Sequence, residues 1–289
     1  MTSQTPPRRG RLLLLCQDRP GIVAAVSDFL FRRGANILHS DQHAAEDGHF
    51  FMRIEFDLAD LDERLPDMRA EFEGRVSQPF GIATRWTSTA RRKRLGVLVS
   101  REDHCLQELL WQERSGDLDA EIACVIGNHA GLEAAATLWG VPFHFVPVTK
   151  DAKGEAEEHQ RRLLREAGVD VVVLARYMQI VSPAFIAEYA DRIINIHHSF
   201  LPAFAGAKPY EQAHERGVKL IGATAHYVTA DLDAGPIIEQ DVQRVDHRHS
   251  ASDIRRRSRQ VERTVLARAV SWHVEDRVLV FGNKTVVFS

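Results

Sequence analysis

The chain has 289 residues, 44% of them hydrophobic, and a net charge of −3 at neutral pH. This length exceeds that of a usual single hydrophobic core, so two domains are expected. The mildly acidic balance argues against nucleic acid and anionic membranes as partners, and the longest early apolar run, residues 12–16, is far too short to span a bilayer.

The cysteines and histidines show no pattern of a disulfide or metal protein. Cys16, Cys105 and Cys124 are an odd number without C-x-x-C spacing, so ordinary buried thiols are expected. None of the fourteen histidines has a recognisable ligand spacing, so no metal is expected. Because the early apolar run is followed by Gln17 and Asp18 instead of a small-residue cleavage site, the sequence predicts a cytoplasmic protein.

Residues 9–86 show the pattern of a small domain. Apolar residues recur with a strand period or a helix period in successive segments, separated by turns rich in glycine, proline and aspartate. The expected elements are a strand at 12–16, a helix at 22–33, a hairpin of strands at 36–38 and 50–56, a helix at 61–72 and a strand near 81–86. This order, β-α-β-β-α-β, is ferredoxin-like.

Residues 87–94 are polar and lack apolar periodicity, which predicts a linker. From 95 to 289, short apolar runs alternate with helical patterns and predict an α/β domain with a doubly wound, mostly parallel sheet. The expected strands lie at 95–99, 122–126, 143–146, 169–174 and 193–196, followed by a strand-loop-strand segment after 222, a helix at 251–274 and a hairpin at 278–288. In such sheets, ligands bind beyond the carboxyl ends of the strands.

The stretch from 193 to 240 carries three side chains suited to acyl chemistry. Asn195, His197 and Asp233 lie where apolar, strand-like segments give way to loops. Attack on a carbonyl carbon places negative charge on its oxygen, which the Asn195 amide can stabilise, while His197 transfers protons near neutral pH. Asp233 would orient that imidazole. The set predicts transfer or hydrolysis of an acyl group.

Each of these residues also has a purely structural interpretation. Asn195 could cap a turn, His197 could be a satisfied buried histidine, and Asp233 could hold the loop that ends at Gly235. Their occurrence together favours catalysis. Ser199 lacks the G-x-S-x-G pattern of an activated nucleophile, so a direct displacement without a covalent intermediate is favoured.

Several motifs give the chain a family resemblance. The motifs are Asn195-Ile196-His197-His198-Ser199-Phe200-Leu201-Pro202, residues 222–226, Leu232-Asp233-Ala234-Gly235-Pro236, residues 176–180 and residues 282–288. Together they resemble the folate-dependent formyltransferase superfamily and, within it, the formyltetrahydrofolate deformylase family. The turn at 18–21, followed by a helix and Gly34-Ala35-Asn36-Ile37, looks like an ACT domain.

The resemblance implies hydrolysis of 10-formyltetrahydrofolate to formate and tetrahydrofolate. Such an activity would supply formate for purine biosynthesis and balance the one-carbon folate pools, with 10-formyltetrahydrofolate as the substrate and no further cofactor. By matched position, Met178, Ile180 and Val181 would line a slot for the pterin ring, and backbone groups near 230–233 would bind its polar edge. The alternative for 176–181 is plain core and helix start, and both can hold because such pockets are mostly apolar.

The ACT resemblance implies regulation. Domains of this kind bind small effectors, often amino acids, between paired copies, so a homo-oligomer (dimer or tetramer) with an amino-acid effector is expected. Asp18 and Asn36, at the mouth of the first helix, are the candidate contacts. An oligomerisation module without a ligand is the alternative, because nothing in the sequence identifies an effector.

The loop after the first strand of the second domain indicates the acceptor of the formyl group. In the related glycinamide ribonucleotide transformylases, this strand leads into a glycine-rich turn that holds the substrate phosphate. Here residues 100–105 contain no glycine, and Glu102 and Asp103 would repel a phosphate. Together with His198, in place of a proline often seen in the transferases, this departure favours water.

Three alternatives remain open. A formyltransferase acting on an amine such as glycinamide ribonucleotide would need Arg101 or Lys208 to bind the phosphate. A catalytically silent amino-acid sensor on the same scaffold is opposed by the intact set of amide, imidazole and carboxylate. A nicotinamide-dependent dehydrogenase is opposed by residues 127–131, which lack the G-x-G-x-x-G spacing.

Overall fold

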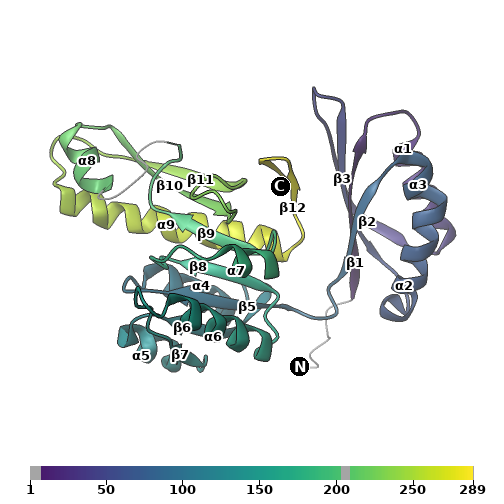
Figure 1. The fold of residues 1–289 in the computed structure, drawn as a ribbon. Coiled ribbons are helices and arrows are strands. Elements are labelled where there is room, and N and C mark those ends of the chain that lie inside the picture. Colours follow the sequence, from purple (N-terminus) through teal and green to yellow (C-terminus); the bar gives the residue numbers. More distant parts are fainter. Residues whose placement is uncertain (1–7, 203–208, 289) are drawn as a thin grey trace. The chain divides into compact units, whose positions relative to one another are not determined.

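The computed structural model describes residues 8–202 and 209–288, and it divides into two compact units that are considered separately (Figure 1). The first unit comprises Met1–Arg92, Asp276–Leu279 and Val286–Ser289, and the second comprises Lys93–Glu275 and Val280–Thr285. Among the described residues, no helix is both long and apolar enough to cross a membrane.

The first unit has the predicted order of elements. They are β1 (Arg9–Gln17), α1 (Ile22–Arg32), β2 (Asn36–Ala44), β3 (His49–Asp57), α2 (Leu61–Phe72), a π-helical turn (Glu73–Ser77), α3 (Gln78–Phe80) and β4 (Ala83–Ser88). The strands form an antiparallel sheet in the order β2-β3-β1-β4. Alternate residues of β1, Leu12 and Leu14, pack with Val26 and Leu30 of α1 in one apolar core. The predicted ferredoxin-like order is confirmed.

The second unit contains a seven-stranded sheet in the order β11-β10-β9-β8-β5-β6-β7. Its strands are β5 (Lys93–Val99), β6 (Ala120–Gly127), β7 (Phe143–Phe145), β8 (Val171–Ala175), β9 (Ile193–His197), β10 (Leu220–Tyr227) and β11 (Ile237–Arg244). The five strands from β7 to β9 pair in parallel, whereas β10 and β11 are antiparallel. The predicted mostly parallel sheet is confirmed.

Helices connect and cover these strands. They are α4 (His104–Ser115), a 3-10 turn (Ala130–Leu132), α5 (Glu133–Leu138), α6 (Lys153–Glu166), α7 (Pro183–Glu188), α8 (Pro209–Glu215) and α9 (Ala251–Val274), and the hairpin of β12 (Val278–Phe281) and β13 (Lys284–Val287) follows. Figure 1 shows the long helix α9 running beside β9, β10 and β11, all of which it contacts.

Both faces of the sheet are buried. Leu98 of β5 and Val172 of β8 belong to an apolar cluster with Leu164 of α6. Val97 and Val173, their neighbours along the same strands, point the opposite way because strand side chains alternate, and they are also fully buried. Since β5, β8 and β9 run in parallel, the loops after them meet at one sheet edge, where a ligand site is expected.

Candidate active site

The structure brings the three predicted catalytic side chains to one place at this sheet edge. Asn195 and His197 are among the last residues of β9, and Asp233 lies in the loop between β10 and β11. Nδ1 of His197 is 3.3 Å from Oδ1 of Asp233. All three residues line the same cavity.

Two local features position Asp233. Its φ angle is 55°, a left-handed conformation that aspartate tolerates better than most residues. Two residues later, a side chain at Gly235 would collide with the carbonyl oxygen of Tyr227, so only glycine allows the loop to return this close to β10. The backbone N–H of Tyr227 donates to the carbonyl of Pro236 at 2.9 Å and closes the loop.

The contact with Asp233 sets the tautomer of His197. Its Nδ1–H donates to the carboxylate, so Nε2 carries the lone pair. This Nε2 is buried and has no hydrogen-bond partner among the described residues. The hydrogen bond from His197 lowers the pKa of Asp233 and outweighs the opposing effect of its burial. The carboxylate therefore stays ionised beside an imidazole nitrogen that is free to accept a proton.

His226 completes the site and was not singled out from the sequence. It lies opposite Asn195 across the antiparallel pair of β9 and β10. Its Nδ1 donates to the carbonyl of Tyr227 at 2.9 Å, so its Nε2 accepts from Nδ2 of Asn195 at 3.1 Å. Burial lowers the pKa of His226, which favours this neutral form. The bond orients the Asn195 amide, and only the register of the two strands reveals it.

A cavity of about 300 Å³ opens beside these side chains. The three predicted folate-contacting residues, Met178, Ile180 and Val181, all line it. Met178 and Ile180 are 58% and 60% exposed, whereas Val181 is buried in the wall. Exposed apolar side chains beside a cavity that also contains polar groups are typical of a site for a small molecule.

His198 lies between the imidazole of His197 and α8. Its ring centroid is 5.2 Å from that of His197 and 5.7 Å from that of Tyr210. Burial lowers the pKa of His198 to about 4, and the positive charge of Arg176 acts in the same direction. His198 is therefore uncharged at neutral pH, whereas a histidine with the ordinary pKa of 6.5 still carries part of a positive charge there.

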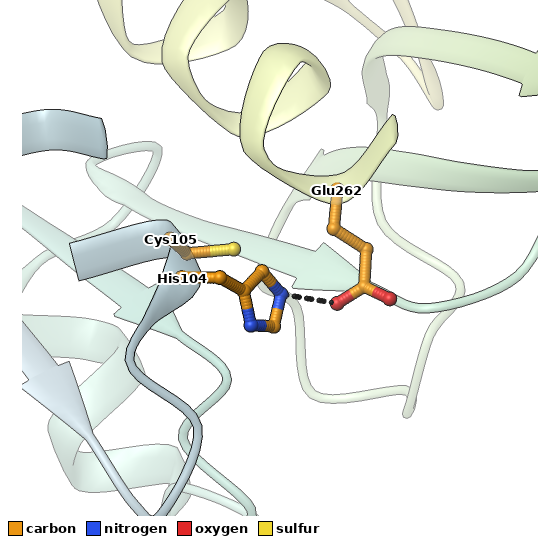
Figure 2. A group of neighbouring side chains, drawn as sticks. All are labelled: His104, Cys105 and Glu262. Carbon is orange, nitrogen blue, oxygen red and sulfur yellow. Dashed lines mark hydrogen bonds and ion pairs between the residues drawn. The ribbon is translucent and has the colours of Figure 1, made fainter. Parts of the chain in front are cut away.

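A second polar cluster, between α4, α8 and α9, was also missed from the sequence. Nε2 of His104 is 2.9 Å from Oε2 of Glu262 (Figure 2). Tyr210 and Ser258 donate their hydroxyl hydrogens to the other carboxylate oxygen at 2.7 Å and 2.8 Å. Burial would raise the pKa of Glu262, but the hydrogen bond from His104 and the charge of Arg176 lower it to about 2.

This cluster resembles a metal site in composition only. His104, Cys105 and Glu262 each present a potential ligand atom, and these atoms lie within 4.8 Å of one another (Figure 2). Both oxygens of Glu262 already accept hydrogen bonds. Burial raises the pKa of the Cys105 thiol well above its usual value, although metals bind the thiolate. The donor set fits a hydrogen-bonded ion network better than a metal centre.

The loop between β5 and α4 is used for protein contacts. Glu102 pairs with Arg259 at 2.7 Å, and the hydroxyl of Ser100 accepts a hydrogen bond from the backbone of Met178 at 3.0 Å. Arg101, one alternative phosphate ligand, is exposed and donates to His129. The other alternative, Lys208, lies outside the described residues.

In the first unit, the two candidate effector contacts are both exposed. Asp18 follows β1, and Asn36 is the first residue of β2. Helix α1 lies between them in the chain. The structure leaves both side chains accessible to a small molecule.

Comparison with known proteins covers both units. A family model described as formyl transferase matches residues 93–270, and one described as ACT domain matches residues 10–73. A formyltetrahydrofolate deformylase of Bacillus subtilis (strain 168) is 53% identical over 283 residues, which is 97% of this chain and 94% of that protein. One of Mycobacterium tuberculosis (strain ATCC 25618 / H37Rv) is 54% identical over 281 residues, 96% of this chain and 90% of that protein.

Among solved structures, a deformylase is likewise more similar to this chain than a transformylase is. A formyltetrahydrofolate deformylase from Pseudomonas syringae pv. tomato str. DC3000 has a TM-score of 0.93 at 49% identity and covers 99% of this chain and 96% of its own. A glycinamide ribonucleotide transformylase 1 from Symbiobacterium toebii has a TM-score of 0.64 at 34% identity and covers 68% of this chain and 95% of its own. The likeness to the first protein includes both units, and the likeness to the second covers only part of the chain.

Proposed function

We propose that the second unit hydrolyses 10-formyltetrahydrofolate to formate and tetrahydrofolate. The chain belongs to the formyl transferase family and, within it, to the formyltetrahydrofolate deformylases. The observation that carries this proposal is the unpartnered Nε2 of His197, which Asp233 holds next to Asn195 at the cavity wall. An imidazole beside a cavity, with its tautomer fixed by a carboxylate, is what a general base for water requires.

The reaction uses the three side chains in turn. Nε2 of His197 takes a proton from water as the water oxygen attacks the formyl carbon, and Asp233 stabilises the resulting imidazolium. Asn195 donates a hydrogen bond to the oxyanion that forms. The bond between the carbon and N10 then breaks, His197 returns its proton to N10, and the acid formed loses its remaining proton to leave as formate.

The apolar wall of the cavity would hold the folate. Met178 and Ile180 would lose their exposed surface against the pterin ring, with Val181 behind them. Backbone groups of 230–233, which also line the cavity, would bind the polar edge of the ring. This placement sets the formyl group beside the catalytic side chains.

Two features of the loop after β5 support water as the acceptor. The loop has no glycine that would let backbone N–H groups surround a phosphate. Its Glu102 pairs with Arg259, so this arginine is not free to bind a phosphate. A phosphorylated amine therefore finds a poorer site here than in the transferases.

The test is a hydrolysis assay of the purified chain with 10-formyltetrahydrofolate in amine-free buffer. Formate and tetrahydrofolate should appear in equal amounts, with formate measured by a coupled assay and tetrahydrofolate by its absorbance. Added glycinamide ribonucleotide should leave the formate yield unchanged and remain unformylated by mass spectrometry. A formylated amine without formate release would instead support the transferase alternative.

We further propose the biological setting of this activity. Residues 95–289 form the catalytic domain, 87–94 the linker and 9–86 a regulatory ACT domain that binds an amino acid near Asp18 and Asn36 in a homo-oligomer, a dimer or a tetramer. The enzyme would act in the cytoplasm, supply formate for purine biosynthesis and balance the folate pools. Calorimetry with individual amino acids and light scattering of the purified chain test the effector and the assembly.

A further inference from the structure

Arg176 adopts a backbone conformation that its side chain does not favour. It directly follows β8 and has a φ angle of 61°. Among the described residues, five non-glycine residues have positive φ angles, and the other four are aspartates, which tolerate this region. A bulky residue kept in a left-handed conformation is often one whose side chain position matters to function.

The guanidinium of Arg176 is buried but has unused hydrogen-bond donors. The side chain is 10% exposed, and neither Nε nor Nη1 has a hydrogen-bond partner among the described residues. The nearest anion is Glu262, 3.4 Å from Nε. This contact is an ion pair without hydrogen-bond geometry, so the donors of Arg176 stay available. Buried, unsatisfied donors of this kind need a partner.

Arg176 lies where two cavities adjoin. The catalytic cavity, which contains His197, is lined by both Arg176 and His198. A second cavity of about 250 Å³ is lined by the same two residues and by side chains of α4, α8 and α9. Arg176 and His198 therefore form the boundary that the two cavities share.

The charges of the second cavity disfavour a dianion more than a small monoanion. Its arginines are matched by carboxylates, in the pairs Arg176–Glu262, Arg255–Glu211 and Arg259–Glu102. A dianion such as phosphate would add two charges to this balanced set, next to Glu102 and Glu211. A planar carboxylate instead matches the parallel N–H groups of a guanidinium with a single charge.

We propose that Arg176 forms a product subsite that binds formate as it leaves the catalytic cavity. The proposal rests on the hydrolysis proposed above, in which formate is the carboxylate formed beside His197. In the subsite formate is separated from N10 of tetrahydrofolate before it reaches solvent. The low pKa of His198 keeps this neighbour neutral, so that of the two residues shared by both cavities Arg176 carries the positive charge.

The test compares formate inhibition in the wild type, Arg176→Met and Arg176→Lys. Arg176→Met removes every donor, whereas Arg176→Lys keeps a positive charge near Glu262 but lacks the paired N–H groups. Initial rates are measured with sodium formate, acetate, phosphate or chloride at constant ionic strength. The formate inhibition constant should rise at least about tenfold in Arg176→Met and by a smaller factor in Arg176→Lys.

The matched control is Arg263→Met, which removes an arginine of α9 that pairs with Glu108 outside both cavities. It should keep the wild-type formate inhibition. Unchanged formate inhibition in Arg176→Met would overturn the proposal, as would stronger inhibition by phosphate than by formate. If Arg176→Met does not fold, unchanged formate inhibition in Arg176→Lys would overturn the proposal instead.

A binding measurement separates this proposal from the proposed function. The line width of ¹³C-formate is recorded with the wild type and with each variant, without folate. Broadening by the wild type that Arg176→Met abolishes supports the subsite even if the chain proves not to hydrolyse 10-formyltetrahydrofolate. A wild type that hydrolyses the substrate but neither broadens the formate line nor is inhibited by formate contradicts the subsite alone.

Discussion

Two of the carboxylate–histidine pairs in the catalytic unit are built in opposite ways. In one, Asp233 lies 3.3 Å from His197, and its side chain is 23% exposed at a cavity. In the other, Glu262 lies 2.9 Å from His104, and its side chain is fully buried. The chemical groups are the same, but their surroundings differ.

The difference lies in how each carboxylate is bonded. Both oxygens of Glu262 accept hydrogen bonds, and its donors come from three helices, so this saturated pair links α4, α8 and α9. The open pair, Asp233 and His197, lines the cavity, and Nε2 of His197 has no hydrogen-bond partner among the described residues. Nδ1 of His104 also lacks a hydrogen-bond partner, but it lies 3.8 Å from the carboxylate of Glu102. A carboxylate held by three donors stabilises a fold, whereas a carboxylate–histidine pair at a cavity can move a proton.

Substitution of the open pair should have the largest effect on activity. Asp233→Asn should fold with little change in stability yet lower the rate of formate release by about 100-fold to 10,000-fold, because the amide neither fixes the tautomer nor stabilises the imidazolium. Tetrahydrofolate formation and thermal unfolding of the same preparation measure both quantities.

The matched control is Asp191→Asn. Asp191 also has a φ angle of 55° but is exposed in the turn before β9, so the substitution tests the same side-chain change at the same backbone conformation. Its activity should stay within about twofold of the wild type. Near-native formate release by Asp233→Asn would remove the carboxylate from the mechanism.

The sequence was sufficient to predict the open pair but not the saturated one. Asp233 lies in a short polar loop between two apolar strands, and His197 ends a strand, so their positions follow from the alternation of apolar and polar residues. Glu262 lies in the middle of a long helix with charged neighbours, and its partner His104 is 158 positions away in the chain. Helical periodicity cannot tell which distant side chain such a carboxylate meets.

Prediction of the fold from the sequence is limited in the same way, because contacts between distant residues are not visible in local patterns. The order of strands and helices in both units follows from apolar periodicity, and α9 was predicted with the bounds that it has. The role of His226 depends on the antiparallel pairing of β9 with β10, and that of Arg176 depends on its backbone conformation. Strand register and φ angles are set by tertiary packing, so neither is visible in the local sequence.

Substitution of the saturated pair should mainly reduce stability. Glu262→Gln should lower the free energy of unfolding by about 3 kcal/mol, because His104 and Arg176 would lose their buried counter-charge. Urea denaturation of the purified variant measures this loss. The control Glu166→Gln changes an exposed glutamate paired with Arg162 at 3.9 Å and should alter stability by less than about 0.5 kcal/mol. If Glu262→Gln were as stable as its control, the network would not hold the helices together.

His198, which lies between the two pairs, should link stability to pH. Its pKa of about 4 in the folded chain is below its ordinary value of 6.5, so between these values the unfolded chain binds a proton that the folded chain does not. The stability that depends on neutral His198 is therefore present above about pH 6.5 and lost as the pH falls toward 4.

His198→Asn should remove that dependence. Urea denaturation at about pH 7 and about pH 4.5 should show a larger loss of stability for the wild type than for the variant. The lowered pKa values of Asp233 and Glu262 also make acid destabilising, but both proteins retain these carboxylates, so their contribution largely cancels. Equal losses in the two proteins would mean that His198 carries its proton in the folded state as well.

The smallest effect is expected at the apolar wall of the open site. Ile180 is 60% exposed and should become covered when folate binds. Ile180→Ala removes apolar surface worth about 1 kcal/mol, so KM should rise about fivefold while kcat stays near the wild-type value. Leu138→Ala, in which a leucine that is 83% exposed on α5 is truncated, should leave both constants unchanged. A fall in kcat at constant KM would mean that Ile180 supports the catalytic side chains instead of the folate, because the wall contacts would then act only in the transition state.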